Sequence, residues 1–397
     1  MKKAYIPVSS DFISQKEINE LILENSNYLD KLGCIQISSQ QMNDAQGLFY
    51  FIVTGGTEKQ ILDLHSKRSK MYDDEEIVLL AHASRNSLPA ALEVLARFQQ
   101  DGKKGNILYL PEIDYIEIST SKPAIEKFYS DNILGGKKIG LIGKPSDWLV
   151  ASSPDRNLVK STFGVEVIPI YLKELEEHYK NIALDGIKDI VSDFLGKSSA
   201  VIEPSSQEIE DSVRIYVALR KLISQYKLDA LTIRCFDLVV DLKTTGCFAL
   251  SRLNDEGIIA GCEGDLVSTI GMMWAQQNFN KLPWMANPSQ IDVKENSVVL
   301  AHCTVPSSLV QDYSIRSHFE SGIGVGIQGE FPLKDVILFR LGGKKLDLIW
   351  KAEGRIVRTE CSDDLCRTQI KVFLNEQYSV QDLLTHPLGN HLIVVHQ

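Results

Sequence analysis

The chain has 397 residues, of which 44% are hydrophobic and 24% are charged, the balance of an ordinary globular protein. Because single hydrophobic cores stop growing at about 250 residues, this length predicts two or three domains. The net charge is -10, and no segment concentrates Lys and Arg. Nucleic acid and anionic membranes are therefore excluded as expected partners.

The N-terminal sequence MKKAYIPVSSDF lacks the apolar region of a signal peptide, and no run of about 18 apolar residues predicts a membrane span. Seven cysteines occur without a CxxC pair, which favours reduced thiols over a disulfide framework. We therefore expect a soluble, cytoplasmic protein.

Two successive stretches alternate short apolar runs with segments of helical period. The first contains the runs AYIPVSS, GCIQISS, LFYFIVTGG, IVLLAHAS and NILYLP. The second contains KKIGLIG, VEVIPIYL, ALTIRCFDL and IIAGCEG. Strands that alternate with helices predict parallel sheets with crossover helices, so we expect Rossmann-like α/β domains over residues 1–133 and 134–285.

The pattern changes after residue 285. The runs NSVVLAHC, VGIQGEF, VILFRLG, KLDLIWKAEGRIVRTE, RTQIKVFL and NHLIVVHQ follow one another without helical spacing. They predict an antiparallel, barrel-like or sandwich domain over 286–397. The expected fold class is thus α/β, with two Rossmann-like parallel-sheet domains followed by a smaller β-rich domain.

Acidic residues follow two strands of the second predicted sheet, where ligands of open α/β sheets bind. Asp237 follows LTIRCF, and Glu263 and Asp265 follow IIAGC. An acid such as Glu263 beside an apolar run requires a partner, because burying an unpaired carboxylate is costly. Asp265 has two interpretations of equal weight, a chemical role or the cap of the helix LVSTIGMMWAQQ.

Two histidines also lie at strand ends, His302 after VVLA and His391 before LIVV. Either one alone is more typical of a structural imidazole held by hydrogen bonds. Together with the carboxylates, they form the oxygen and imidazole donor set that Mn²⁺ or a similar divalent ion accepts. The sequence therefore indicates a metal site.

The segments TGGTE (54–58) and NSLPAALE (86–93) each follow a strand and open a helix. Ordinary turn chemistry accounts for their shape, with Thr57 as a cap and Pro89 in a first helical turn. A functional interpretation adds that exposed helix starts carrying Asn86 and Ser87 bind hydroxyls or an anion. The sequence contains no nucleotide-binding motif of these two kinds, since neither GxGxxG nor GxxxxGK[ST] occurs.

Nine strings occur in one order between Val53 and Val395: VTGGTE, NSLPAALE, GKPSDWLVAS, CFDL, CEGDL, AHC, SHFESGIGVGIQGEF, CRTQ and GNHLIVV. In this set the chain resembles the compact branch of the L-fucose isomerase-like family, which includes the L-fucose and L-arabinose isomerases. The resemblance implies two Rossmann-like domains and a β-rich domain. It also implies an Mn²⁺-dependent aldose-ketose isomerase that moves protons between C1 and C2 of an open-chain sugar through an enediol.

The resemblance also implies site residues. Asp237 and His391 would be metal ligands, and the second acidic ligand would be Glu263, with Asp265 as the alternative. These carboxylates would act as acid and base. The substrate would contact Thr57, Glu58, Asn86, Ser87, Trp148 and His302. For Trp148, a place in the core is an equal alternative to an apolar face for the sugar.

Other functions stay open at this point. Two lobes around a cleft also describe a sugar-binding protein, and the altered string PLKDVILFRL is compatible with a catalytically silent relative. The helix starts at Thr57 and Asn86 have no evident partner among the chain's own metal candidates. We therefore expect a homo-oligomer whose active sites are shared between subunits.

Overall fold

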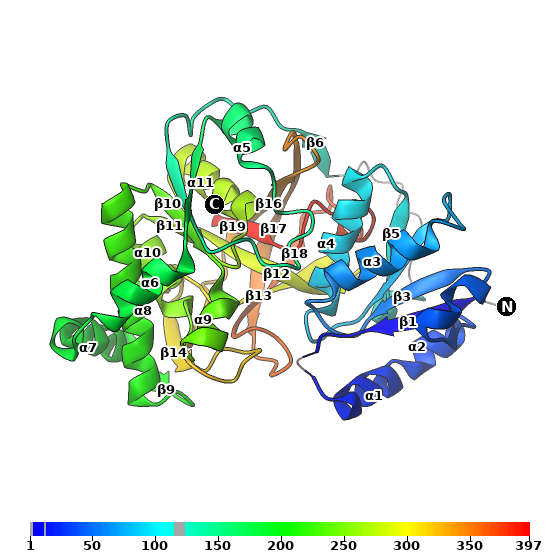
Figure 1. The fold of residues 1–397 in the computed structure, drawn as a ribbon, viewed down its shortest axis with the longest axis horizontal. Helices are drawn as coiled ribbons and strands as arrows, with labels where there is room; N and C mark the ends of the chain where they lie inside the picture. The colour runs from blue at the N-terminus through cyan, green and yellow to red at the C-terminus, as the bar shows by residue number, and fades with distance from the viewer. Residues whose placement is uncertain (1–2, 12, 115–123) are drawn as a thin grey trace.

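The computed structural model describes residues 3–11, 13–114 and 124–397. Two parallel sheets and one antiparallel barrel make up most of the molecule (Figure 1). In Figure 1 much of the barrel lies between the first sheet, at the right, and the second sheet, at the left. The predicted parallel sheets and antiparallel barrel are thus confirmed, while the boundaries at 133/134 and 285/286 remain a prediction.

The first sheet has five parallel strands in the order β2-β1-β3-β4-β5. Its central strand LFYFI is buried along its whole length, as expected for a strand covered by helices on both faces. The strands are β1 (Ala4–Val8), β2 (Ile35–Gln36), β3 (Leu48–Ile52), β4 (Ile77–Ala81) and β5 (Gly105–Tyr109). The helices are α1 (Gln15–Glu24), α2 (Ser26–Lys31), η1 (Ser39–Asp44), α3 (Glu58–Arg68), α4 (Ser87–Gln100) and η2 (Leu110–Glu112).

The second sheet has four parallel strands in the order β11-β10-β7-β8. They are β7 (Lys138–Ile142), β8 (Glu166–Ile170), β10 (Ala230–Ile233) and β11 (Ile259–Gly261). The helices are α5 (Arg156–Phe163), α6 (Leu172–Lys180), η3 (Leu184–Gly186), α7 (Lys188–Lys197), α8 (Ser206–Tyr226), α9 (Cys235–Asp241), α10 (Cys247–Asp255) and α11 (Leu266–Phe279). The helix α11 packs so tightly on β11 that Gly261 has no room for a side chain. A Cβ added there would lie 2.1 Å from Thr269 Oγ1.

The barrel runs in the order β16-β19-β12-β13-β18-β17 and closes through the pairing of β16 with β17. The strands are β12 (Pro283–Asp292), β13 (Ser297–His302), β16 (Asp335–Gly342), β17 (Leu348–Glu360), β18 (Thr368–Leu374) and β19 (Leu392–His396), with α12 (Asp382–Thr385) before β19. The short strand β6 (Ile125–Lys127) adds to β17 from outside the barrel.

One predicted barrel strand lies elsewhere. The run VGIQGEF forms β15 (Gly326–Glu330), which pairs with β14 (Asp312–Arg316), and β14 in turn pairs with β9 (Ala200–Val201). A short helix, η4 (Ser307–Leu309), precedes this sheet. The barrel closes without β15 because β16 and β17 satisfy each other's hydrogen bonds. Alternation alone could not distinguish these two sheets.

The three sheets share one continuous hydrophobic core, which includes side chains from β3, β10 and β13. A smaller core lies between the first sheet and α1 and α2. Among the described residues, every helix is too short or too polar to span a lipid bilayer. The shared core fixes the carboxyl edge of β11 against the barrel, and the candidate site lies at this junction.

Candidate metal centre

Three side chains from distant parts of the sequence converge where the second sheet meets the barrel. Glu263 lies in the turn between β11 and α11, His302 ends β13, and His391 directly precedes β19. One ligand atom from each lies within 4.8 Å of the other two. A carboxylate and two imidazoles are donors that Mn²⁺, Zn²⁺ and similar ions accept.

The backbone presents Glu263 in an unusual conformation. Its φ is +63°, and the next residue, Gly264, has a φ of +74°. A non-glycine residue in this region costs about 1–3 kcal/mol and is typical of functional sites. Glycine is required at 264, since an added Cβ would lie 2.7 Å from Pro145 Cα.

The segment around Trp148 holds Glu263 in place. The backbone amide of Ser146 donates to the Glu263 carbonyl at 2.9 Å, and Trp148 Nε1 donates to Glu263 Oε2 at 2.6 Å. Trp148 also packs edge-on against Phe236, with ring centroids 5.0 Å apart. The contact of Trp148 with a sugar stays a prediction, and its observed partner is the carboxylate of Glu263.

His391 is fully buried, and its two ring nitrogens have different surroundings. Nδ1 lies 3.0 Å from Asp265 Oδ2, whereas Nε2 has no hydrogen-bond partner among the described residues. The nearest carboxylate oxygen to Nε2 is Glu263 Oε1, at 3.7 Å. An imidazole whose Nδ1–H is held by a carboxylate presents its Nε2 lone pair to a metal. The unpaired Nε2 therefore fits a metal ligand.

Burial and charge set the protonation of the three side chains. Burial opposes protonation of His391, but the charges of Glu263 and Asp265 outweigh it and raise the His391 pKa to about 9. Burial and the neighbouring His391 lower the His302 pKa to about 3. Burial would raise the pKa of Glu263, but the charge of His391 and the hydrogen bond from Trp148 lower it. Glu263 is thus ionised and His302 neutral at neutral pH.

Asp265 caps α11, one of the two roles that the sequence left open, and its chemical role stays a prediction. It caps α11 by accepting from Ser268 N at 2.7 Å, and Ser268 Oγ donates to its second oxygen at 2.6 Å. That second oxygen also accepts from His391 and, at 3.1 Å, from Arg340. Both oxygens of Asp265 are thus engaged, whereas a carboxylate oxygen of Glu263 belongs to the group of three.

Arg340 lies on β16 with only 1% of its surface exposed and connects Asp265 to the first sheet. Its guanidinium donates to Asp265, to Ser268 Oγ, and to Ser152 Oγ at 2.5 Å. Glu93 on α4 accepts from Ser152 Oγ at 2.8 Å and from the amide of Asn390 at 3.1 Å. This buried network joins both parallel sheets and the barrel beside His391.

Sequence patterns did not single out Arg340 and Glu93, although a signal was present. Each is a charged residue inside an apolar segment, VILFRLG for Arg340 and LPAALEVLA for Glu93. As for Glu263, burying either charge without a partner would be costly, so each residue is expected to have one. Their partners lie far away in the sequence and could not be identified from it.

Asp237 does not belong to the group of three. It lies on α9, with 37% of its side chain exposed, and its Oδ1 accepts from Arg234 Nε at 2.9 Å. Arg234 also pairs with Asp147 at 2.8 Å. Of the predicted ligands, the structure thus brings Glu263 and His391 together, while Asp237 pairs with Arg234 and its role as a ligand stays a prediction. His302, expected to contact substrate, lies next to His391, with ring centroids 5.5 Å apart.

Three of the four helix-start residues expected to be exposed, Thr57, Glu58 and Ser87, are buried, so the expectation is wrong for them, while Asn86 is half-buried. Thr57 and Ser87 are 0% exposed and Glu58 is 2% exposed. The hydroxyls of Thr57 and Ser87 donate to the carbonyls of Thr54 and Ile52, which gives them a local structural role. Their contact with a substrate stays a prediction.

Other buried polar atoms around the site also lack partners among the described residues. They are Glu58 Oε2, Asn86 Oδ1, Ser146 Oγ and Asn390 Oδ1. Ser146 and Asn390 adjoin the site directly, through the Glu263 carbonyl and the peptide bond to His391. Burial raises the pKa of Glu58 well above its usual value, and the negative charges of Glu93 and Glu263 raise it further. Since buried polar groups are normally paired, these atoms are suited to the hydroxyls of a ligand.

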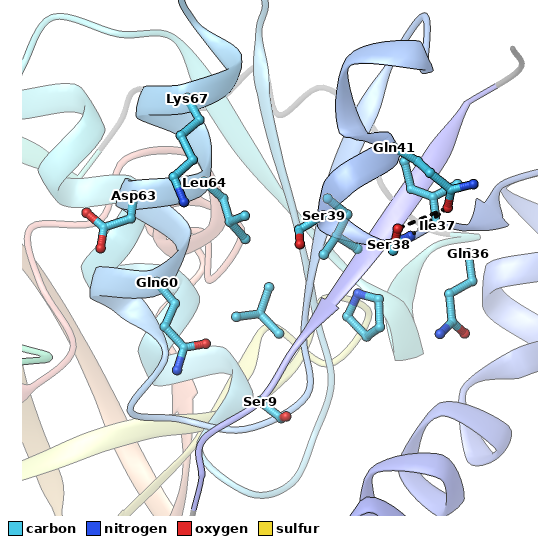
Figure 2. Close-up of a pocket in the computed structure, with 13 residues that line it drawn as sticks. Ser9, Gln36, Ile37, Ser38, Ser39, Gln41, Gln60, Asp63, Leu64 and Lys67 are labelled. Carbon is cyan, nitrogen blue, oxygen red and sulfur yellow. Dashed lines mark hydrogen bonds between the residues drawn. The ribbon is translucent and has the colours of Figure 1, made fainter.

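A large cavity of about 730 Å³ lies elsewhere, on the first sheet (Figure 2). It is lined by residues of β1, η1 and α3 and by residues next to them, including Ser9 after β1, Ser38 before η1 and Gln60 on α3. None of Glu263, His302 and His391 lines it. Figure 2 shows Ser38 hydrogen-bonded to Gln41, and this pair caps the N-terminus of η1. We therefore place the candidate chemistry at the barrel and not in this cavity.

Among known proteins, the chain has low sequence identity to three sulfoquinovose isomerases. The sulfoquinovose isomerase of Alkalicoccus urumqiensis is 24% identical over 270 residues, covering 65% of this chain and 60% of the relative. Those of Priestia aryabhattai and Priestia megaterium are each 25% identical over 212 residues, covering 51% of this chain and 47% of the relative. The matched regions thus span about half of each Priestia protein's length. No protein-family model matches the chain.

Two solved structures match the chain weakly. A XylFII-LytSN complex matches with 9% identity over 70% of this chain and 92% of that chain, at a TM-score of 0.15. The D-threo-3-hydroxyaspartate dehydratase from Delftia sp. HT23 matches with 10% identity over 97% of this chain and 88% of that chain, at 0.14. Scores this low do not indicate a shared fold.

Because Asp265 accepts hydrogen bonds from Ser268, His391 and Arg340, we predict that removing its charge lowers the free energy of unfolding substantially. A cap alone is worth about 1 kcal/mol, but Asp265→Asn also leaves Arg340 buried without its anion, so we expect a loss of about 3–5 kcal/mol. Urea unfolding of the metal-free protein measures it. The matched control is Asp155→Asn at the exposed cap of α5, expected to cost less than about 1 kcal/mol. Equal stability of the two variants would contradict the network.

Proposed function

We propose that this chain is a metal-dependent aldose-ketose isomerase that acts on an open-chain sugar through an enediol. The observation that carries the proposal is the convergence of Glu263, His302 and His391, with the buried Nε2 of His391 left unpaired among the described residues. The sulfoquinovose isomerases that the chain resembles support a sugar as the substrate.

The three side chains would hold the ion, for which Mn²⁺ is the first candidate. When bound, a divalent ion would supply positive charge that stabilises the negative charge developing on the sugar oxygens. Asp265 would keep His391 in the tautomer with a free Nε2, and Trp148 would fix the orientation of the Glu263 carboxylate. These contacts preorganise the ligands before the ion arrives.

Proton transfer between C1 and C2 requires a carboxylate near the carbon skeleton. Glu263 is ionised and only 13% of its side chain is exposed, so it is the leading base. Asp237 could assist from the adjacent strand end if the sugar drew it away from Arg234. Asp265 would act as a positioning residue, since both its oxygens already have donors.

The unpaired polar atoms of Glu58, Asn86, Ser146 and Asn390 are suited to sugar hydroxyls. Asn86 donates to Glu320 of the same chain, so it does not need a neighbouring subunit as its partner. A homo-oligomer with shared active sites remains a prediction.

Isomerisation should depend on Glu263. Replacing it by Gln keeps its shape and removes its charge and basicity, so we expect at least about a hundredfold loss of turnover and weaker metal binding. Metal analysis of the purified protein, followed by a screen of sulfoquinovose, glucose and pentoses for ketose formation, provides the assay. Glu166→Gln, at an exposed position in β8, is the matched control. Binding of sugar without turnover in the wild type would instead favour a binding protein.

Metal affinity should rise with pH. In the metal-free protein His391 carries a proton up to about pH 9, above its usual value of 6.5, and a metal must displace this proton. Raising the pH through this window removes the competing proton, so the apparent affinity for Mn²⁺ should rise about tenfold per pH unit and level off near pH 9. Calorimetry in buffers of different ionisation enthalpy measures both affinity and proton release. An affinity that is flat from pH 6.5 to 9 would contradict the assignment of His391.

A further inference from the structure

A second cavity, of about 680 Å³, opens at the carboxyl edge of the second sheet. Its walls come from the carboxyl ends of three neighbouring strands, β10, β7 and β8, and from the segments that follow them, together with the first residue of α5. The polar lining residues are Lys144, Asp147, Arg156, Tyr171, Arg234 and Asp237. In open α/β sheets, this edge is where ligands bind.

Positive charge predominates in this cavity, although the whole chain has a net charge of -10. Asp147 and Asp237 both pair with Arg234, at 2.8 and 2.9 Å. Lys144 and Arg156 form no ion pair in the part of the chain that the structure describes. Two lining cations thus remain free to meet an anion from solution.

A third cation comes from the first sheet. Hydrogen bonding with Arg234 is the largest cause of the lowered pKa of Asp147, and the charges of Lys59 and Lys144 lower it further. Lys59 follows Glu58 at the start of α3. Cations from both parallel sheets therefore face Asp147, next to the candidate metal centre.

The cavity and the metal centre lie in one row along the sheet edge. Glu263 follows β11, Arg234 and Asp237 follow β10, Lys144 follows β7 and Tyr171 follows β8, in the order of the sheet. Neighbouring strands lie about 4.8 Å apart, so β11 and β7 are separated by roughly 10 Å. This separation between β11 and β7 is comparable to the length of an extended six-carbon chain. The segment 145–148 contacts both sites, since Trp148 donates to Glu263 and Arg234 donates to the carbonyl of Pro145.

We propose that this cavity binds an anionic group, a sulfonate or a phosphate, at the end of the open-chain sugar remote from its carbonyl. Lys144 and Arg156 supply the charge, and the hydroxyl of Tyr171 supplies a further donor. Arg234 stays paired with its two carboxylates and shapes the wall. This assignment rests on the proposed function, because it takes the metal centre as the place where the carbonyl end binds.

The binding test compares three ligands on the metal-free protein, so that no turnover interferes. Sulfoquinovose, glucose 6-phosphate and glucose are titrated by calorimetry into the wild type and into variants Lys144→Gln and Arg156→Gln. We expect each variant to weaken binding of an anionic sugar about tenfold relative to glucose, since a hydrogen bond to a charged group is worth about that much. Lys160→Gln, on the same helix as Arg156 but outside the cavity, is the control. The sulfonate and phosphate arms show which anion fits.

Added salt gives a second measurement. Lys144 and Arg156 are exposed, so their attraction for an anion should fall as ionic strength rises, whereas glucose binding should not change. Equal affinity of the wild type and both variants for the anionic sugars, or no binding of any anionic sugar, would overturn the assignment. Failure of the proposed function is a separate result, namely no ketose from any sugar by the metal-loaded wild type.

Discussion

The buried contact among Asp265, Arg340 and His391 is the constraint on which the candidate site depends. Asp265 ends the turn that carries Glu263, Arg340 belongs to the barrel, and His391 precedes the last barrel strand. A buried carboxylate cannot remain unpaired, so the turn, the barrel and the histidine must assemble together. The geometry of the metal centre is therefore a consequence of how the second sheet docks on the barrel.

The same contact explains the charge state of the site. In the metal-free protein, the carboxylates of Glu263 and Asp265 face Arg340 and protonated His391, so their charges balance. This balance is the physical reason that the pKa of His391 rises to about 9 although burial opposes it. A divalent ion would take the place of the proton on Nε2 and leave the hydrogen bond from Nδ1 to Asp265 intact.

The sequence predicted the parallel sheets well because continuous apolar runs such as LFYFI are typical of strands that helices cover on both faces. It also singled out Glu263, His302 and His391, because each lies at a strand end. It does not show which strands meet, because VGIQGEF pairs outside the barrel and the partner of Arg340, Asp265, lies far away in the sequence. The pairing of Asp237 with Arg234 follows from a spacing that the sequence does show, since the two residues lie three positions apart at the start of a helix.

The central claim is that one ion binds between the second sheet and the barrel, and anomalous diffraction from crystals grown with Mn²⁺ tests it most directly. We expect a single strong peak bonded to Glu263, His302 Nε2 and His391 Nε2 at about 2.0–2.2 Å. Crystals that bind Mn²⁺ elsewhere, or that show no peak within reach of His391 Nε2, would contradict it.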